Sequence, residues 1–330
     1  MDVMMGMRTI CVSHGEDADG LICAALLRHL RDASTTLVTY DDFGDPLRST
    51  QPPVEELYIC DLNIREELLE EILRINEFAD VTVVDHHPTA EGVLERLELA
   101  GVTVVHSPLD CASVLLYDHL RDDLGREAAR LAAYAAVSDQ FEDGPIASAL
   151  LSGLDRQFVQ HEALILAHAL HRETTAGFRS LVVEELSRFA YPHRIEGAVE
   201  AALAHLEHMA GLLETLPERA QRVGRLAYVG AVDETSIGAV AGLLVDAMGV
   251  DVGVCYKRGD EGNVSISIRG RRGLQIHLGE VTRRLAERRG GFGGGHMRAS
   301  GASIPAQNPL EFIRDLGEEL ERAEQSKNSR

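Results

Sequence analysis

The sequence predicts an α/β fold, with a mostly parallel sheet in the N-terminal domain and a helical connection to a smaller α/β domain. Three observations carry this prediction. Short apolar runs alternate with helical patterns at the start, a long Ala- and Leu-rich helical stretch follows, and a second alternating section comes last. Strands that alternate with helices are typical of βαβ units and parallel sheets. A length of 330 residues agrees with two domains.

The first domain is expected to contain five short strands, because five apolar runs rich in β-branched residues interrupt the helical patterns. These runs are Arg8–Ser13, Thr35–Tyr40, Leu57–Cys60, Val81–Val84 and Val102–Val105. Helices are expected over Leu21–Leu30 and Glu66–Phe78. From Asp110 to Met209 the pattern is helical and includes a helix over Glu127–Val137.

A break at Arg188–Gly197 indicates the connection between the domains, because Pro192 cannot continue a helix. The expected boundaries are 1–190 for the first domain, 191–222 for a helical linker and 223–330 for the second domain. Strands of the second domain are expected at 226–232, 251–257 and 263–270, helices at 237–248, 274–289 and 310–324, and a glycine-rich loop at 290–295.

The composition excludes several classes of protein. With 45% hydrophobic and 26% charged residues, the chain can bury a core and is not disordered. No apolar run reaches about 18 residues, so no transmembrane helix is expected. The N-terminus lacks a secretory signal pattern, which predicts a cytoplasmic protein. The net charge of −21 weighs against tight, non-specific binding to long nucleic acids, since such binding needs a broad basic surface.

Acidic and histidine residues gather in four short clusters of the first half. They are His14, Asp17 and Asp19; Asp61; Asp85, His86 and His87; and Asp139. The first three clusters directly follow predicted strands, and the carboxyl ends of parallel strands meet at one edge of a sheet. The fourth follows a helix that could reach the same edge. Taken singly, each cluster could equally be a helix cap or a polar turn; jointly, they favour one site.

Carboxylates packed this closely repel one another, so the cluster needs compensating positive charge. Arginines are not interleaved with these residues, which points to bound cations. Oxygen and imidazole ligands without thiolates suit Mn²⁺, Mg²⁺ or Fe²⁺. Two cations bridged by one carboxylate are used for displacement at phosphorus. The sequence leaves the choice between Mn²⁺ and Mg²⁺ open, because the ligand set suits both.

The second domain carries a different signal, since Arg269 ends a predicted strand and a run of glycines precedes His296. Glycines allow close approach of the backbone and can turn N–H groups toward an anion. Residues 268–291 also hold seven arginines against two glutamates in an otherwise acidic chain. An anion site is favoured over a plain turn, although four arginines at helical spacing could simply face water.

Together these motifs resemble the DHH phosphoesterase superfamily, in the branch that joins a DHH domain to a DHHA1 domain. This branch includes RecJ-like exonucleases, nano-RNases, phosphoadenosine-phosphate phosphatases and cyclic-di-AMP phosphodiesterases. The resemblance covers nearly the whole chain. It implies a catalytic domain, a substrate-binding DHHA1 domain with an active-site cleft between the two, and a pair of divalent ions, usually Mn²⁺.

The resemblance also implies a role for each motif residue. One ion would be held by His14, Asp17 and Asp61, and the other by Asp19, Asp61, His86 and Asp139. Asp85 would orient a metal ligand, and His87 would face the substrate phosphate. The substrate would be gripped by Arg269, Gly293, Gly294, Gly295 and His296. Two residues separate His14 from Asp17, where many relatives have three and others one, which leaves open whether His14 binds metal.

The function expected from this reading is a metal-dependent phosphodiesterase, in which a metal-activated water attacks the phosphoester. Compact length and acidic charge favour small substrates: short oligonucleotides, cyclic dinucleotides or bisphosphate nucleotides. A RecJ-like exonuclease acting on longer single strands is the second hypothesis. A non-catalytic replication partner is a third, because some relatives that lost metal ligands serve as scaffolds. No membrane partner is expected, and a homodimer stays open.

Overall fold

The computed structural model describes residues 8–40, 42–90, 92–231, 236–259, 262–305 and 309–328. The chain forms two compact units, residues 1–206 and 207–330, and the boundary falls inside helix α9 (Ala198–Arg219). Each unit has its own core, and each is described by itself below. None of the helices in the described ranges is long and apolar enough to cross a membrane.

Unit 1 is built on a five-stranded sheet in the order β2-β1-β3-β4-β5, with every pair parallel. The strands are β1 (Thr9–His14), β2 (Ser34–Val38), β3 (Glu56–Cys60), β4 (Asp80–Asp85) and β5 (Thr103–His106). All five match the apolar runs of the sequence to within a few residues. The mostly parallel sheet expected for the N-terminal domain is therefore confirmed.

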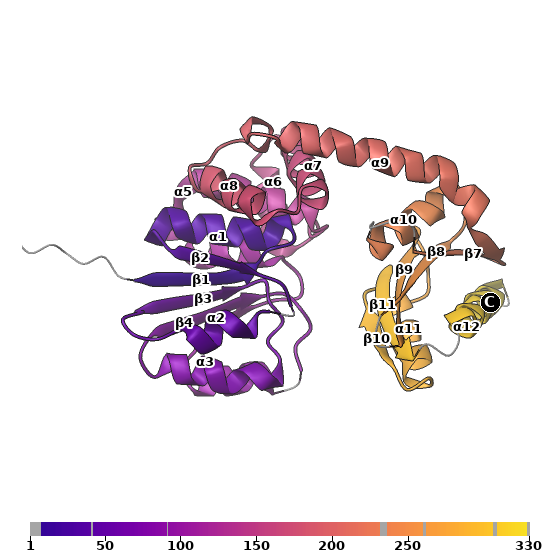
Figure 1. Ribbon diagram of the computed structural model, residues 1–330, viewed down its shortest axis with the longest axis horizontal. Helices are drawn as coiled ribbons and strands as arrows, with labels where there is room; N and C mark the ends of the chain where they lie inside the picture. Colours follow the sequence, from indigo (N-terminus) through magenta and orange to yellow (C-terminus); the bar gives the residue numbers. More distant parts are fainter. Residues whose placement is uncertain are drawn as a thin grey trace, which may run out of the picture. The chain divides into compact units, whose positions relative to one another are not determined.

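Helices cover both faces of this sheet, with α1 and α8 on one side and α2 and α3 on the other (Figure 1). The helices of unit 1 are α1 (Ala18–Arg31), α2 (Gly44–Ser49), α3 (Leu69–Asn76), α4 (Val93–Leu99), α5 (Ala112–Ser138), α6 (Pro145–Ser152), α7 (Arg156–Arg172) and α8 (Ala176–Ser187). Single 3₁₀ turns lie at Glu66–Leu68 and Pro192–Arg194. The short helices α2 and α4 were not anticipated, because two turns of helix carry too little periodicity to be recognised.

The two cores of unit 1 follow from the alternation of side chains along each strand. In β1, Cys11 faces the core with α1, α5, α7 and α8, whereas Val12 faces the core with α2, α3 and α4. In β3, Tyr58 and Ile59 divide in the same way. The strands are apolar on both faces because both faces are covered, as in other parallel sheets.

Unit 2 contains a six-stranded mixed sheet in the order β10-β11-β9-β8-β7-β6. Its strands are β6 (Gln221–Val223), β7 (Leu226–Gly230), β8 (Val252–Arg258), β9 (Asn263–Gly270), β10 (Phe292–Gly295) and β11 (Ala299–Pro305). Its helices, after the end of α9, are α10 (Ile237–Ala247), α11 (Leu278–Glu287) and α12 (Pro309–Asn328). Only β7 and β8 pair in parallel among the described strands of this sheet.

The glycine-rich segment is a strand and not the loop that the sequence suggested. Phe292–Gly295 forms β10, which pairs antiparallel with β11 from Phe292↔Ser303 to Gly295↔Ser300. Glycine disfavours strands in general because it loses much conformational entropy on folding. Here close packing requires it: a Cβ on Gly293 would lie 2.9 Å from the carbonyl oxygen of Gly301.

Candidate metal centre

The register of the sheet brings three of the four sequence clusters to one edge. Ser13 lies opposite Cys60, and Cys60 lies opposite Val84. His14, Asp61 and Asp85 therefore occupy equivalent positions at the carboxyl ends of three adjacent strands. The fourth cluster arrives from a helix, because Asp139 follows the last residue of α5 and lies within reach of the same edge.

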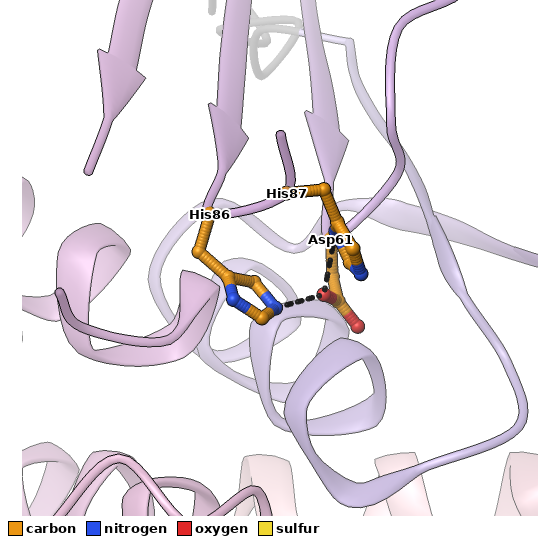
Figure 2. A group of neighbouring side chains, drawn as sticks. All are labelled: Asp61, His86 and His87. Atoms are coloured by element: carbon orange, nitrogen blue, oxygen red, sulfur yellow. Dashed lines mark ion pairs between the residues drawn. The ribbon is translucent and has the colours of Figure 1, made fainter. Parts of the chain in front are cut away.

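Asp61 forms ion-pair contacts with both His86 and His87 (Figure 2). Its carboxylate is 3.4 Å from Nδ1 of His14, 3.3 Å from Nε2 of His86 and 3.9 Å from Nδ1 of His87. The residue adopts a left-handed backbone conformation with φ of 57°. Asp and Asn tolerate this region better than most residues, so the turn after β3 can direct a carboxylate into the site.

His86 is surrounded by carboxylates. Its Nε2 atom lies 3.3 Å from Asp61, 3.6 Å from Asp139 and 3.9 Å from Asp19. Two ligands that each bond one ion at about 2.1 Å are roughly 3.0–3.5 Å apart at octahedral or tetrahedral angles. The separations around His86 are thus close to those of ligands that share an ion.

Three groups of side chains have candidate ligand atoms that all lie within 4.8 Å of one another. The groups are Asp61, His86 and His87; His14, Asp17 and Asp61; and Asp19, His86 and Asp139. All six residues that the sequence suggested as ligands are included. Asp61 and His86 each belong to two of the groups.

The two carboxylates of the first motif also organise the fold. Asp17 caps α1 by accepting a hydrogen bond from the backbone N–H of Gly20 at 3.2 Å. Asp19 is 1% exposed and accepts hydrogen bonds from the backbone N–H groups of Ala112 (2.7 Å) and Ser113 (2.8 Å), at the start of α5. The partial positive charge of a helix N-terminus stabilises a buried carboxylate in this position.

Burial and close packing shift the pKa values of three side chains in this cluster. Burial raises the pKa of Asp61 well above its usual range, and the nearby charges of Asp17 and Asp19 raise it further. Burial, together with Asp19 and Asp17, raises the pKa of Asp139 to about 8. Burial alone would lower the pKa of His14, but the nearby carboxylates of Asp17 and Asp61 outweigh it and raise the pKa to about 10.

Several buried side-chain atoms of the cluster lack a hydrogen-bond partner, which suits the binding of a cation. Among the described residues, Nε2 of His14, Oδ2 of Asp61, Oδ2 of Asp85 and Oδ2 of Asp139 are buried without a hydrogen-bond partner. A buried polar atom left in this way costs about 1–3 kcal/mol, and more when it is charged. Divalent cations would supply the missing partners and the missing positive charge, and carboxylate and imidazole donors suit Mn²⁺ or Mg²⁺.

Asp85 and His87 form a separate pair beside the cluster. Oδ1 of Asp85, which is 1% exposed, lies 2.8 Å from Nδ1 of His87. The carbonyl oxygen of His87 accepts a hydrogen bond from Nε2 of His106 at 2.8 Å. Asp85 thus orients His87, which is half-buried at the rim of the site.

Sequence analysis missed several neighbours of the site. Tyr40 contacts both His14 and His87, with ring centroids 4.8 Å and 5.8 Å apart, and Phe141 lies 4.8 Å from His86. His171 of α7 lines a small pocket together with Asp17, Asp19 and Asp139. Their positions along the chain could have pointed to two of them, because Tyr40 lies two residues beyond β2 and Phe141 lies two residues beyond Asp139.

The residues expected to bind substrate lie at one end of the sheet in unit 2. Arg269 of β9 pairs with Ala299 of β11, and Gly295 of β10 pairs with the adjacent Ser300. Two strand spacings separate Arg269 from Gly295, which is about 10 Å. His296 follows directly and donates its backbone N–H to the carbonyl oxygen of Ala299 at 2.7 Å. Arg269, Gly295 and His296 therefore lie at the same end of this sheet.

The guanidinium of Arg269 is half-buried, and burial lowers its pKa. It donates to Oγ of Ser267 and to the carbonyl oxygen of Ile268, both at 3.1 Å. Within the described residues no carboxylate forms an ion pair with it. A half-buried cation held by neutral acceptors is suited to receive an anion.

Comparisons with known proteins agree with this architecture. Residues 225–323 match the DHHA1 domain. The whole chain resembles a solved pGpG-specific phosphodiesterase, PggH from Vibrio cholerae, with 14% identity and a TM-score of 0.56 over 96% of this chain and 99% of that one. A sequence comparison with curated proteins finds no match.

Two further solved structures show the same fold. The DHH domain of a member of a family of ribosomal proteins matches with a TM-score of 0.67 and 16% identity, over 96% of this chain and 87% of that one. RecJ from Thermus thermophilus in complex with Mn²⁺ matches with a TM-score of 0.63 and 18% identity, over 96% of this chain and 52% of that one.

Residues 225–323 match the DHHA1 domain, and over 96% of its length the chain shares the fold of the solved structures of PggH and RecJ.

Proposed function

We propose that this protein is a metal-dependent phosphodiesterase that hydrolyses short nucleotides. The observation that carries the proposal is the cluster of buried carboxylates and imidazoles at the carboxyl ends of the unit 1 strands, several of whose buried atoms lack a hydrogen-bond partner. The fold supports it, since a solved structure with that fold is described as a pGpG-specific phosphodiesterase.

Two divalent cations are proposed at this cluster. His14, Asp17 and Asp61 would hold one, and Asp19, Asp61, His86 and Asp139 the other, with Asp61 bridging. RecJ structures of the same fold contain Mn²⁺ or Mg²⁺, and of these two ions we propose Mn²⁺. Bound divalent cations lower the pKa of a water and offset negative charge that develops on phosphate.

The side chains around the cluster position the substrate. Asp85 holds the His87 ring through Nδ1, which directs Nε2 away from Asp85 and toward the rim. From the DHHA1 domain, Arg269 and the segment from Gly293 to His296 would bind the nucleotide phosphate through the guanidinium and backbone N–H groups. Productive orientation of the phosphate is their contribution to the rate.

Small substrates are favoured over long strands. The net charge of −21 provides no broad basic surface for a long polyanion. Short oligonucleotides, cyclic dinucleotides and bisphosphate nucleotides carry few phosphates and need only a local site. Processive degradation of single strands is the competing function, and the RecJ fold similarity is the observation in its favour.

A single hydrolysis assay tests the proposal. The purified protein with Mn²⁺ is incubated with equal concentrations of a 5′-phosphorylated dinucleotide, cyclic-di-AMP, a bisphosphate nucleotide and a long single strand, and the products are separated by chromatography. We expect the small substrates to disappear first. Degradation of the long strand alone would establish the competing function.

Two variants connect the activity to the cluster. Asp61→Asn should lower turnover by at least about 100-fold, because the bridging carboxylate is replaced by a poor metal ligand. Asp80→Asn is the matched control, because this exposed carboxylate lies at the first residue of β4, at the opposite end of the strand from the site. Wild-type turnover by Asp61→Asn would refute the proposed site.

A further inference from the structure

Tyr40 makes three contacts with its neighbours beside the candidate metal centre. Its hydroxyl lies 3.0 Å from Nε2 of His87, and its ring lies against His14 with centroids 4.8 Å apart. Its backbone carbonyl accepts a hydrogen bond from Nη2 of Arg65 at 2.7 Å. The side chain is nevertheless 37% exposed. Tyr40 is therefore a fixed aromatic group at the rim of the site.

The hydrogen bonds around His87 set the direction of the contact with Tyr40. Oδ1 of Asp85 lies 2.8 Å from Nδ1 of His87, and the Tyr40 hydroxyl lies 3.0 Å from Nε2 of the same ring. In the neutral tautomer with its proton on Nδ1, His87 donates to the carboxylate and the Tyr40 hydroxyl donates to the lone pair on Nε2. This tautomer gives a chain in which Tyr40 donates to His87 and His87 donates to Asp85.

This chain engages both nitrogens of the His87 ring. The His87 backbone is held independently, since its carbonyl oxygen accepts from Nε2 of His106 at 2.8 Å and the next carbonyl, of Pro88, accepts from Asn63 at 3.1 Å. Of the described contacts, the one from Tyr40 is the hydrogen bond that fixes the exposed end of the imidazole. Removing it frees one end of the ring and leaves the rest in place.

We propose that Tyr40 is a positioning residue, which orients His87 for the substrate phosphate through its hydroxyl. This inference rests on the proposed function for its kinetic consequence, but the contact itself does not. Tyr40 lies 47 residues before His87 in the sequence and outside all four sequence clusters. The role therefore adds a fifth segment, the one that follows β2, to the site.

The first test is made on the metal-free protein and needs no activity. Long-range ¹H–¹⁵N spectra report the tautomer and the hydrogen bonding of each histidine ring, and the His87→Gln variant assigns the His87 signals. We expect a single Nδ1–H tautomer in the wild type. In Tyr40→Phe we expect a clear shift of the Nε2 resonance or a mixture of tautomers. An unchanged His87 spectrum in Tyr40→Phe would overturn the proposal.

The second test is kinetic, with Mn²⁺ and the substrate that the wild type hydrolyses fastest. Tyr40→Phe keeps the ring against His14 and removes one hydrogen bond, so kcat should fall about tenfold while KM changes less than about threefold. Mn²⁺ affinity should be unchanged. Tyr228→Phe is the control, because it also removes a tyrosine hydrogen bond, to Gln221 in unit 2.

A double-mutant cycle shows whether Tyr40 acts through His87. On a His87→Gln background, Tyr40→Phe should have no further effect on kcat. Independent, multiplying effects of the two substitutions would contradict the positioning role. If the wild type hydrolyses none of the substrates, the proposed function fails, and the spectra still decide whether Tyr40 holds His87.

Discussion

Replacing Asp61 by Asn should have different effects on the stability of the protein without metal and with metal. Asp61 is 1% exposed and lies between His14 and His86. Asn preserves the shape of the side chain and tolerates the left-handed backbone at φ 57°. The substitution therefore removes a charge and a metal ligand without forcing a change of the main chain.

In the metal-free protein the variant should be no less stable than the wild type. The pKa of Asp61 is raised in the folded state, so its neutral form is stabilised by folding. That contribution is present below the unfolded pKa and is lost as the pH rises through the folded pKa. Asn resembles the neutral carboxyl at every pH. The stability difference should therefore be small in acid and should favour the variant as the pH rises.

With Mn²⁺ present, the wild type should be more stable than the variant. A ligand present at 100 times its dissociation constant adds about 2.7 kcal/mol to the free energy of unfolding. For a unit of this size, each kcal/mol corresponds to roughly 2–4 °C, so the wild-type melting temperature of unit 1 should rise by roughly 5–10 °C. Because Asp61 belongs to two of the candidate ligand groups, the variant should lose most of this shift.

Calorimetric scans with and without Mn²⁺ measure both effects, with Asp80→Asn as a control that should respond to metal like the wild type. A shift of wild-type size in Asp61→Asn would refute the bridging position of Asp61. A metal-free variant that is clearly less stable than the wild type at neutral pH would instead refute the argument from the raised pKa.

Three further outcomes follow from the same geometry. Gly20→Ala should destabilise unit 1 by about 1–3 kcal/mol in urea unfolding, because its Cβ would lie 2.1 Å from the carbonyl oxygen of His14, whereas Gly177→Ala meets no atom within 4 Å. Mn²⁺ affinity, measured by titration calorimetry, should fall by at least about tenfold per pH unit below about 8, since metal must displace the proton that the raised pKa of Asp139 retains and competes with protons on Asp61 and His14 as well; constant affinity would contradict this. Gly294→Ala should fold normally, because its Cβ meets open space, but should raise KM for the nucleotide if substrate approaches this strand; an unchanged KM would place the substrate elsewhere.

Much of this architecture could be predicted because it is encoded in short windows of sequence. The five strands of unit 1 appear in the sequence as apolar runs. Because both faces of the sheet are covered, such a run can be recognised as a strand without knowing which strand it pairs with. The site was also visible locally, since His14, Asp61 and Asp85 each follow or end a strand. Parallel pairing alone then places them at one edge.

Other features were not visible because they depend on neighbours far along the chain. The glycine segment became strand β10 through its pairing with β11, which overrides the weak strand preference of glycine. Helix α5 is interrupted at Gly125, with φ of 71°, shortly before the helix that the sequence predicted over Glu127–Val137. The strand pairing of the glycine segment, in contrast, cannot be inferred from its own residues.

The sequence by itself determined the layering of the fold and the kinds of ligand at the sheet edge, because side-chain periodicity and strand ends are local properties. Only the tertiary structure decided which partners these side chains have. The carboxylate of Asp19 meets the N-terminus of α5 through Ser113, 94 residues away, and Tyr40 meets His87 across 47 residues. Such contacts depend on strand register and helix packing, which are settled only when the whole unit folds.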